Sequence, residues 1–273
     1  MKISVIFTTY NSPEWLEKVL WGWQQQSDHN FELVIADDGS GPETKALIDK
    51  FKDSSSFDIQ HIWHQDNGFQ KCRILNRALV AATGDYIVMT DGDCIPRKDF
   101  LYEHRKNATT GYFLSGGYFK LPMSISKSIT QEDVQTGRCF DANWLKQNGV
   151  KLGFRAIKLN AKPIVAYLLN RLIPTRKTWN GHNASCFKED ALTVNGFDER
   201  MKYGGLDAEF GGRLENAGLK IRRIRYNAVC LHLDHARGYA NPIDMQNNRK
   251  IRQTSISQKI IETPAGIHQL TED

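Results

Sequence analysis

The amino-acid sequence predicts an α/β fold, in which a Rossmann-like, mostly parallel sheet is flanked by helices. The first observation is that short apolar runs alternate with helical patterns through the first half of the chain, as they do in parallel sheets. The second is that polar residues follow three of the predicted strands, where such folds bind ligands. The third is size, because 273 residues, 40% of them hydrophobic, can form one large domain with a well-buried core.

The first half is expected to hold four strands separated by helices. The apolar run at residues 3–7 is typical of a buried parallel strand. Ser12 and Pro13 then supply an N-cap and a first-turn proline for a helix whose apolar face extends to about residue 26. The same alternation continues with strands at 31–36, 59–63 and 86–89, and with helices at 42–52 and 70–82.

The second half has a less regular pattern. A helix is expected at 207–217, with Gly218 directly after its end, where glycine favours termination. From residue 241 onward the chain is polar and weakly patterned, and no clean linker interrupts it earlier. We therefore expect one domain followed by a tail, with further strands at 112–115, 219–225 and 228–231.

Hydropathy and cysteine usage exclude several classes of protein. The longest apolar runs, 164–169 and 228–231, are far shorter than the ~20 residues of a membrane-spanning helix. The N-terminal apolar run is also too short for a secretory signal, so we expect a cytoplasmic protein. The cysteines are odd in number and lack paired spacing, which predicts reduced thiols rather than disulfides or a zinc site: Cys72, Cys94, Cys139, Cys186 and Cys230.

The net charge of +5 is unevenly distributed along the chain. No acidic residue lies between Asp141 and Glu189, but nine basic residues do: Lys146, Lys151, Arg155, Lys158, Lys162, Arg171, Arg176, Lys177 and Lys188. Such a block faces nucleic acid, anionic lipid or a phosphorylated substrate, or is simply a solvated surface. Aromatic residues are sparse in it and no nucleic-acid-binding motif accompanies it, so we expect no nucleic-acid partner.

Within this block, residues 151–177 interleave apolar and basic side chains. An amphipathic basic segment can lie in the headgroup layer of an anionic membrane, with its apolar face buried in lipid. The alternative is that the apolar residues pack on the sheet and the charges face water. Peripheral contact with anionic membrane through 151–177 is therefore an expectation.

Polar side chains at three strand ends are the clearest functional signal. They occupy 8–11, 37–38 and 91–93, and the last of these is Asp91-Gly92-Asp93. Paired carboxylates are ligands that Mg²⁺ and Mn²⁺ prefer, and the glycine lets the backbone approach a ligand closely. An Asp-rich turn is the alternative, but the position after a buried strand favours a ligand site.

Four motifs together resemble the family-2 glycosyltransferases of the GT-A fold: TTYN (8–11), IADDGS (35–40), DNGFQKCRILNRAL (66–79) and ATGDYIVMTDGDCIP (82–96). The NGFQ run is most similar to the chondroitin-polymerase and bacterial envelope-polysaccharide branch. NGFDERMKYGGLDAEFGGRLENAG (195–218) resembles that branch and the β-1,4-galactosyltransferases. The resemblance spans about 2–120 and 179–236. It implies a GT-A domain over 1–240, with a nucleotide-sugar half (1–120), an acceptor half (121–240) that forms a C-terminal acceptor-side lobe, and a tail (241–273).

The resemblance assigns roles to the polar strand ends. Thr8, Tyr10 and Asp38 match positions that hold the uracil and ribose of a UDP-sugar. Arg73 matches a position near the nucleotide and diphosphate, although it is equally typical of a surface helix. Asp91, Gly92 and Asp93 match the ribose- and metal-binding DxD motif, with Asp93 as the metal ligand.

The second half carries the remaining assignments. Asp207 matches the catalytic base, and Gly204 and Gly205 before it let a substrate approach the backbone. Leu206 stands where the family usually has a glutamate, and Glu209 is expected to face another side of the helix.

Two further positions complete the implied site. His232, with His235 as second choice, matches the third metal ligand. An imidazole ligand favours Mn²⁺ over Mg²⁺. Trp179-Asn180-Gly181-His182-Asn183 matches the region that lines the donor sugar, in which Trp179 stacks on a sugar face or else belongs to the core.

The resemblance thus implies a metal-dependent, inverting transfer of a hexose or N-acetylhexosamine from a UDP-sugar to a glycan or lipid-linked glycan. It implies a role in the synthesis of lipopolysaccharide, capsule or a related envelope polysaccharide, at the inner face of the cytoplasmic membrane. Leu206 leaves a second interpretation open, in which the chain is a nucleotide-sugar-binding module with impaired catalysis.

Overall fold

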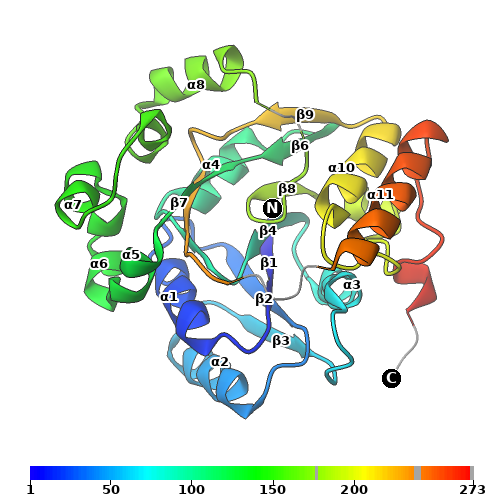
Figure 1. Ribbon diagram of the computed structural model, residues 1–273, viewed down its shortest axis with the longest axis horizontal. Coiled ribbons are helices and arrows are strands. Elements are labelled where there is room, and N and C mark those ends of the chain that lie inside the picture. The colour runs from blue at the N-terminus through cyan, green and yellow to red at the C-terminus, as the bar shows by residue number, and fades with distance from the viewer. Residues whose placement is uncertain (176–177, 237–240, 271–273) are drawn as a thin grey trace.

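The computed structural model describes residues 1–175, 178–236 and 241–270. Its main sheet has seven strands in the order β3-β2-β1-β4-β8-β6-β9 (Figure 1). Four adjacent strands, all predicted by the sequence, run parallel to one another: β1 (Ile3–Thr9), β2 (Phe31–Asp37), β3 (Ile59–Trp63) and β4 (Tyr86–Asp91). The α/β prediction is confirmed.

Three helices connect these strands: α1 (Pro13–Trp23), α2 (Pro42–Ser54) and α3 (Lys71–Ala81). Proline occupies the first turn of α1 and α2, where its missing N–H costs nothing. Ser12 is the N-cap residue of α1, as predicted, but its side chain makes no cap hydrogen bond. Only its carbonyl takes part, accepting from the Leu16 N–H at 3.0 Å.

The second half of the chain completes the sheet and adds a smaller one. β8 (Ala184–Phe187) runs antiparallel between β4 and β6 (Tyr112–Ser115), and β9 (Lys220–Arg223) follows β6 at the edge. The second sheet has the order β5-β10-β7. Its strands are β5 (Cys94–Pro96), β7 (Gly117–Lys120) and β10 (Val229–His232).

The helix predicted near Asp207 is α10 (Leu206–Asn216), and Gly218 follows its end with a φ of +95°. The polar tail expected from residue 241 instead contains α11 (Pro242–Ser257), which lies alongside α10 (Figure 1). The other helices, which the sequence patterns do not reveal, are α4 (Phe100–Asn107), α5 (Met123–Ser128), α6 (Gln131–Gln135), α7 (Ala142–Gln147), α8 (Pro163–Leu172) and α9 (Lys188–Thr193). Three 3-10 turns accompany them: η1 (Arg138–Phe140), η2 (Phe154–Leu159) and η3 (Ile267–Gln269).

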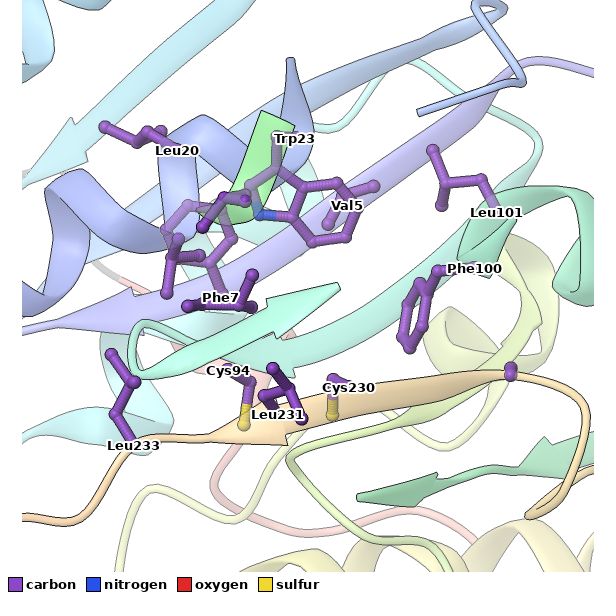
Figure 2. Packing of buried hydrophobic residues seen from close by; sticks show 14 of the residues in the cluster. Val5, Phe7, Leu20, Trp23, Cys94, Phe100, Leu101, Cys230, Leu231 and Leu233 are labelled. Carbon is purple, nitrogen blue, oxygen red and sulfur yellow. The ribbon is translucent and has the colours of Figure 1, made fainter. Parts of the chain in front are cut away.

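Each face of the main sheet has its own hydrophobic cluster. One cluster joins α1 to β1 and to the small sheet, and Figure 2 shows Trp23 above Cys94, Leu231 and Cys230. Trp23 stacks on Phe7 and meets Phe100 edge-on. The other cluster packs α3, α9 and α10 against the opposite face. All five cysteines are buried and free, as predicted.

The basic block forms α7, η2 and α8 at the periphery of the molecule (Figure 1). Only Ala166 is buried along α8, whereas Ile164 and Leu172 are 76% and 74% exposed. Lys158 turns inward and donates to the Tyr118 carbonyl at 2.9 Å. Arg176 and Lys177 of this block lie outside the described residues. Among the described residues, no helix has the length and hydropathy needed to span a membrane.

Candidate active site

The three polar strand ends meet at one edge of the main sheet. β1 lies between β2 and β4 in parallel register, so Thr8 is level with both Ala36 and Asp91. Asp38 directly follows β2, and its backbone N–H donates to the Thr9 carbonyl at 3.0 Å. Parallel strands end together, so the order of strands gathers side chains that are far apart in sequence.

Asp38 is a buried carboxylate with a partner on each oxygen. His64 Nε2 lies 2.8 Å from Asp38 Oδ1, and the Gln70 backbone N–H donates to Oδ2 at 3.1 Å. At the rim, the Tyr10 hydroxyl donates to Asp66 at 2.8 Å, and this hydrogen bond raises the pKa of Tyr10. The ring of Tyr10 is 51% exposed. This sheet edge thus combines a fixed hydrogen-bond acceptor with an aromatic face that can stack on a planar base.

Gly92 allows the turn after β4 to pass tightly over β1. Its N–H donates to the Thr8 carbonyl at 3.1 Å, and a Cβ at this position would lie 2.5 Å from that oxygen. Only glycine fits here without moving the backbone. The turn therefore fixes Asp91 and Asp93 on either side of it.

Lys71, in the first turn of α3, faces these carboxylates. Its Nζ donates to Asp91 Oδ1 at 2.9 Å. Burial alone would lower the pKa of Lys71, but the charges of Asp91, Asp207 and Asp93 hold it above its ordinary value. Conversely, burial would raise the pKa of Asp91, and the ammonium of Lys71 holds it below its ordinary value. A fixed cation thus lies among the carboxylates of the site.

Asp207 begins α10 on the other side of this cation. Burial raises its pKa to about 6, with a further contribution from Asp91 against the opposing effect of Lys71. The Gly181 backbone hydrogen-bonds to it, and a Cβ on Gly181 would lie 2.7 Å from Asp207 Oδ1. A carboxylate whose pKa is near neutrality is suited to accept a proton. Gly205 before α10 has a φ of +84° and leaves open space where a side chain would stand.

Asp93 lies beside both candidate histidines. Its Oδ2 is 3.7 Å from His232 Nε2 and 3.0 Å from His235 Nε2. Each histidine has Nδ1 against a backbone carbonyl, that of Leu233 or Ala236, which can only accept. Nδ1–H donates to that carbonyl in each ring, so Nε2 is the nitrogen that faces Asp93.

The donor set suits a divalent cation. Asp93, Cys94 and His232 offer ligand atoms within 4.8 Å of one another in the described part of the chain. Burial raises the pKa of the Cys94 thiol, which leaves the carboxylate and imidazole as the available donors. Carboxylate oxygen together with imidazole nitrogen fits Mn²⁺ well and Mg²⁺ less well.

His182 belongs to the 179–183 segment that the resemblance assigns to the donor sugar, and the structure brings it to the site. Its ring packs edge-on against Tyr118 at 4.4 Å, and burial lowers its pKa to about 4. Its Nε2 is buried without a hydrogen-bond partner among the described residues. Because Asp91, His232 and Asp93 influence its charge, this orphaned nitrogen borders the carboxylate cluster.

Trp179 corrects one sequence-based assignment. Its side chain is 1% exposed and packs between Phe113 and Phe210, so it offers no face to a sugar. A Cβ on Gly211 would lie 2.5 Å from the Trp179 Cβ, which reflects how closely α10 covers the indole. Its neighbours Gly181 and His182 reach the site instead.

Arg73 and Glu209 each form an ion pair with a residue outside the carboxylate cluster. Arg73 Nη1 lies 3.9 Å from Glu199, so this arginine is directed toward the loop before α10. Glu209 is buried against Arg213 at 2.8 Å and accepts from Ser255. Glu209 therefore cannot take the place of the family's glutamate, as the sequence predicts. Leu206, which stands at the position of that glutamate, is buried in the core.

Lys71 and His64 are the residues that sequence reasoning missed. Only Lys71 carries a local signal: a lysine in the first turn of a helix opposes the helix dipole, and α3 has no acidic residue there to offset it. His64 acquires its position through tertiary contacts and leaves no pattern in the sequence.

Two families match this chain. Residues 4–122 match the family described as Glycosyl transferase family 2, and residues 171–236 match the one described as N-terminal domain of galactosyltransferase. The uncharacterized glycosyltransferase YfnE of Bacillus subtilis (strain 168) is 25% identical over 278 residues, which are 91% of this chain and 69% of YfnE. The hyaluronan synthase of Pasteurella multocida is 31% identical over 276 residues, with 94% of this chain and 27% of that protein covered.

Solved structures show the same fold. Staphylococcus aureus TarS 1–349 in complex with UDP-GlcNAc superposes with a TM-score of 0.63 at 16% identity, covering 98% of this chain and 69% of that one. The mannosyltransferase PcManGT from Pyrobaculum calidifontis, in complex with GDP-Man and Mn²⁺, superposes with a TM-score of 0.58 at 20% identity. This match covers 94% of this chain and 62% of that one. Several relatives are thus considerably longer than this chain.

Proposed function

We propose that the chain transfers a hexose or N-acetylhexosamine from a UDP-sugar to a glycan acceptor, because residues 4–122 match the family described as Glycosyl transferase family 2. The observation that carries the proposal is the cluster of Asp91, Lys71 and Asp207 beside Asp93 at the carboxyl ends of β1 and β4. It combines a candidate base, a fixed cation and a candidate metal ligand in one site.

UDP is the donor nucleotide that this site suits. Asp38, held by His64 and Gln70, can accept the imide N–H of uracil, and the Tyr10 ring can stack on the base. The complex of TarS with UDP-GlcNAc, on the same fold, supports this choice.

We propose that Asp93 and His232, with His235 as the alternative or additional ligand, hold Mn²⁺ or Mg²⁺. When bound, the metal would neutralise the negative charge of the diphosphate leaving group. The Mn²⁺ in the PcManGT complex supports a metal in this fold. Lys71 supplies a second positive charge through its ammonium, next to Asp91.

Asp207 is the proposed general base. It accepts the proton of the acceptor hydroxyl as that oxygen attacks the anomeric carbon, while the sugar–phosphate bond breaks and UDP leaves. A single displacement inverts the anomeric configuration. Its pKa of about 6 keeps most of the carboxyl ionised at neutral pH while leaving it basic enough to hold the proton.

The acceptor is proposed to be a glycan or lipid-linked glycan in the synthesis of lipopolysaccharide, capsule or a related envelope polysaccharide. The hyaluronan synthase of Pasteurella multocida and the chondroitin synthase of Escherichia coli, 23% identical over 273 residues, support a polysaccharide product. This chain covers only 38% of that chondroitin synthase, so the acceptor of the whole protein is part of the proposal.

We further propose that α8 and η2 contact the inner face of an anionic cytoplasmic membrane. Exposed Ile164, Tyr167 and Leu172 on α8 stand beside Phe154 on η2, which is 65% exposed. A hollow of about 420 Å³ at these elements is lined mainly by small and apolar residues, together with Asn160 and Lys162. The adjoining β9 is also basic, and Arg223 binds the Ile173 carbonyl after α8. Basic residues near such a surface contribute about 1 kcal/mol each.

Release of UDP tests the function. The chain is incubated with a panel of UDP-sugars and Mn²⁺, with and without EDTA, and free UDP is measured. We expect release from one or two donors, lost with EDTA. The alternative, a sugar-nucleotide-binding module with impaired catalysis, is favoured by Leu206 and predicts UDP-sugar binding without UDP release.

A further inference from the structure

Helix α11 holds the loop that leads into α10 through one buried side chain. Asn248 is 2% exposed, and its amide nitrogen lies 2.8, 3.1 and 2.8 Å from the carbonyl oxygens of Lys202, Tyr203 and Gly204. Its Oδ1 accepts from the Lys202 N–H at 3.3 Å. One amide group thus contacts four backbone polar groups of this loop, with its two N–H donors shared among three carbonyl oxygens.

The loop ends directly at the candidate base. Gly204 and Gly205 have φ angles of +104° and +84°, and α10 starts at the next residue with Asp207 in its first turn. Two consecutive left-handed glycines give the backbone little intrinsic preference for this conformation. Contacts from outside the loop must therefore fix it.

The same loop also touches the donor side of the site. The Tyr203 ring meets Phe69 edge-on at 6.3 Å, and Phe69 lies two residues before Lys71. The loop is therefore a connection between the segment that carries Lys71 and the helix that carries Asp207.

Polar contacts attach the rest of α11 to α10. Ser255 donates to Glu209 at 2.8 Å, and Asn216 donates to the Ser255 and Ile260 carbonyls at 3.0 and 2.8 Å. Asn248 and Ser255 are the buried residues of α11, two turns apart on one face. These contacts attach α11 to α10 without Asn248, so the role of the Asn248 amide is to hydrogen-bond to the loop.

We propose that Asn248 is a positioning residue of the transfer reaction, which fixes the 202–205 loop and thereby the place of Asp207 relative to the acceptor. This inference rests on the proposed function. Asn248 touches neither donor nor acceptor in this role. Its loss should therefore affect turnover and leave the uracil pocket of Asp38, on the far side of β1, unchanged.

The test compares three variants. Asn248→Ala removes the amide, and Asn248→Asp keeps its size but replaces the donors by a carboxylate facing three carbonyl oxygens. Asn247→Ala is the matched control, because Asn247 is the exposed neighbour on the same helix. We expect both Asn248 variants to lower kcat for sugar transfer about tenfold or more, with the Kd for UDP within twofold of wild type. Asn247→Ala should match wild type.

Hydrogen exchange followed by mass spectrometry gives a readout without activity. In Asn248→Ala, peptides covering 202–207 should exchange faster, while peptides from β1 and β4 keep their protection. A wild-type kcat in Asn248→Asp would overturn the proposal. So would unchanged exchange at 202–207 in Asn248→Ala, or a loss of UDP binding together with a loss of sheet protection in that variant. If wild type releases no UDP from any donor, the function fails, and the exchange result still decides whether Asn248 holds the loop.

Discussion

At the scale of single residues, the site is a balance of charges around Lys71. The ammonium of Lys71 has a different net effect on two carboxyl groups. It holds the pKa of Asp91 below its ordinary value, but it only partly offsets the burial that raises the pKa of Asp207. Two carboxylates at the same sheet edge thus acquire different proton affinities from their surroundings. That difference separates a group that binds cations from one that accepts protons.

Replacing Asp207 by Asn should lower turnover by about 10²–10⁴ while UDP affinity is retained, because a positioned general base typically contributes that much. Glu215→Gln, an exposed carboxylate on the same helix, is the control and should be silent. Steady-state transfer assays and UDP titration provide the measurement. Near-normal transfer by Asp207→Asn would mean that the base lies elsewhere.

The pH profile gives an independent check of this base. Asp207 must be ionised to accept a proton, so kcat of the wild type should rise with pH through about 6 and then level off. The residual activity of Asp207→Asn should lack this limb. A wild-type rate that stays constant from pH 5 to pH 8 would contradict the assignment.

Replacing Asp93 by Ala should abolish Mn²⁺-dependent UDP release and leave the melting temperature nearly unchanged, because a ligand in a surface turn contributes little to the core. Asp58→Ala, whose side chain is 83% exposed, is the control. Isothermal titration with Mn²⁺ and UDP release are measured. Wild-type rates of Asp93→Ala in EDTA-treated buffer would exclude the proposed metal role.

The sequence predicts those site residues that directly follow a strand. Asp38, Asp91 and Asp93 are found at one edge because parallel strands end together. Trp179 was misassigned because an aromatic residue next to a site motif can equally belong to the core, and only burial distinguishes the two. Lys71 was missed because its role depends on α10 approaching α3 from a distant part of the chain.

At the scale of elements, α8 and α11 show two ways in which a helix departs from hydrophobic patterning. Apolar residues of α8 face outward, where a pattern alone would bury them. The buried residues of α11 are polar, Asn248 and Ser255, so its sequence resembled an unstructured tail. A search for hydrophobic periodicity detects a helix only when its buried face consists of apolar side chains, and neither helix meets that condition.

The α8 surface should bind anionic vesicles at low salt and release them as salt rises, because the attraction is largely electrostatic. Replacing the exposed Lys151, Arg155 and Lys162 by Glu should abolish binding. Lys158 is left intact because it already binds the Tyr118 carbonyl. Co-sedimentation with phosphatidylglycerol-containing and neutral vesicles measures the effect.

A charge-matched control lies on α2, at the opposite end of the molecule (Figure 1). Lys45, Lys50 and Lys52 are exposed there, and replacing them by Glu changes the net charge equally. This variant should still bind. Equal loss of binding in both variants, or wild-type binding without preference for anionic lipid, would contradict a specific α8 surface.

At the scale of the whole molecule, buried histidines couple stability to pH. Burial lowers the pKa of His104 from 6.5 to about 4, and its ring nitrogens contact Ser185 and Asn183 at 2.7 and 2.9 Å. The unfolded chain therefore binds a proton below pH 6.5 that the folded chain rejects. The free energy of unfolding should fall as pH decreases from about 6.5 to about 4.

From pH 7.5 to pH 5 this single histidine should cost about 2 kcal/mol of stability. His104→Asn should be less stable at pH 7.5 but lose less on acidification, whereas His29→Gln, at an exposed position, should follow the wild type. Urea unfolding at the two pH values measures both. An unchanged difference between the two pH values in His104→Asn would contradict the assignment.

Ser185 reaches His104 and Tyr86 because β8 is inserted between β4 and β6. This insertion has a consequence for synthesis on the ribosome. The nascent chain makes β4 early, but the strand that covers its open edge ends at Phe187 and emerges only after much of the second half is translated. Until then Tyr86–Met89 is an unpaired edge of buried-type residues, the kind that pairs with other chains. The growing polypeptide must be shielded through that interval, because the sheet that begins with residues 3–91 is covered at its β4 edge only when residues 184–187 are made.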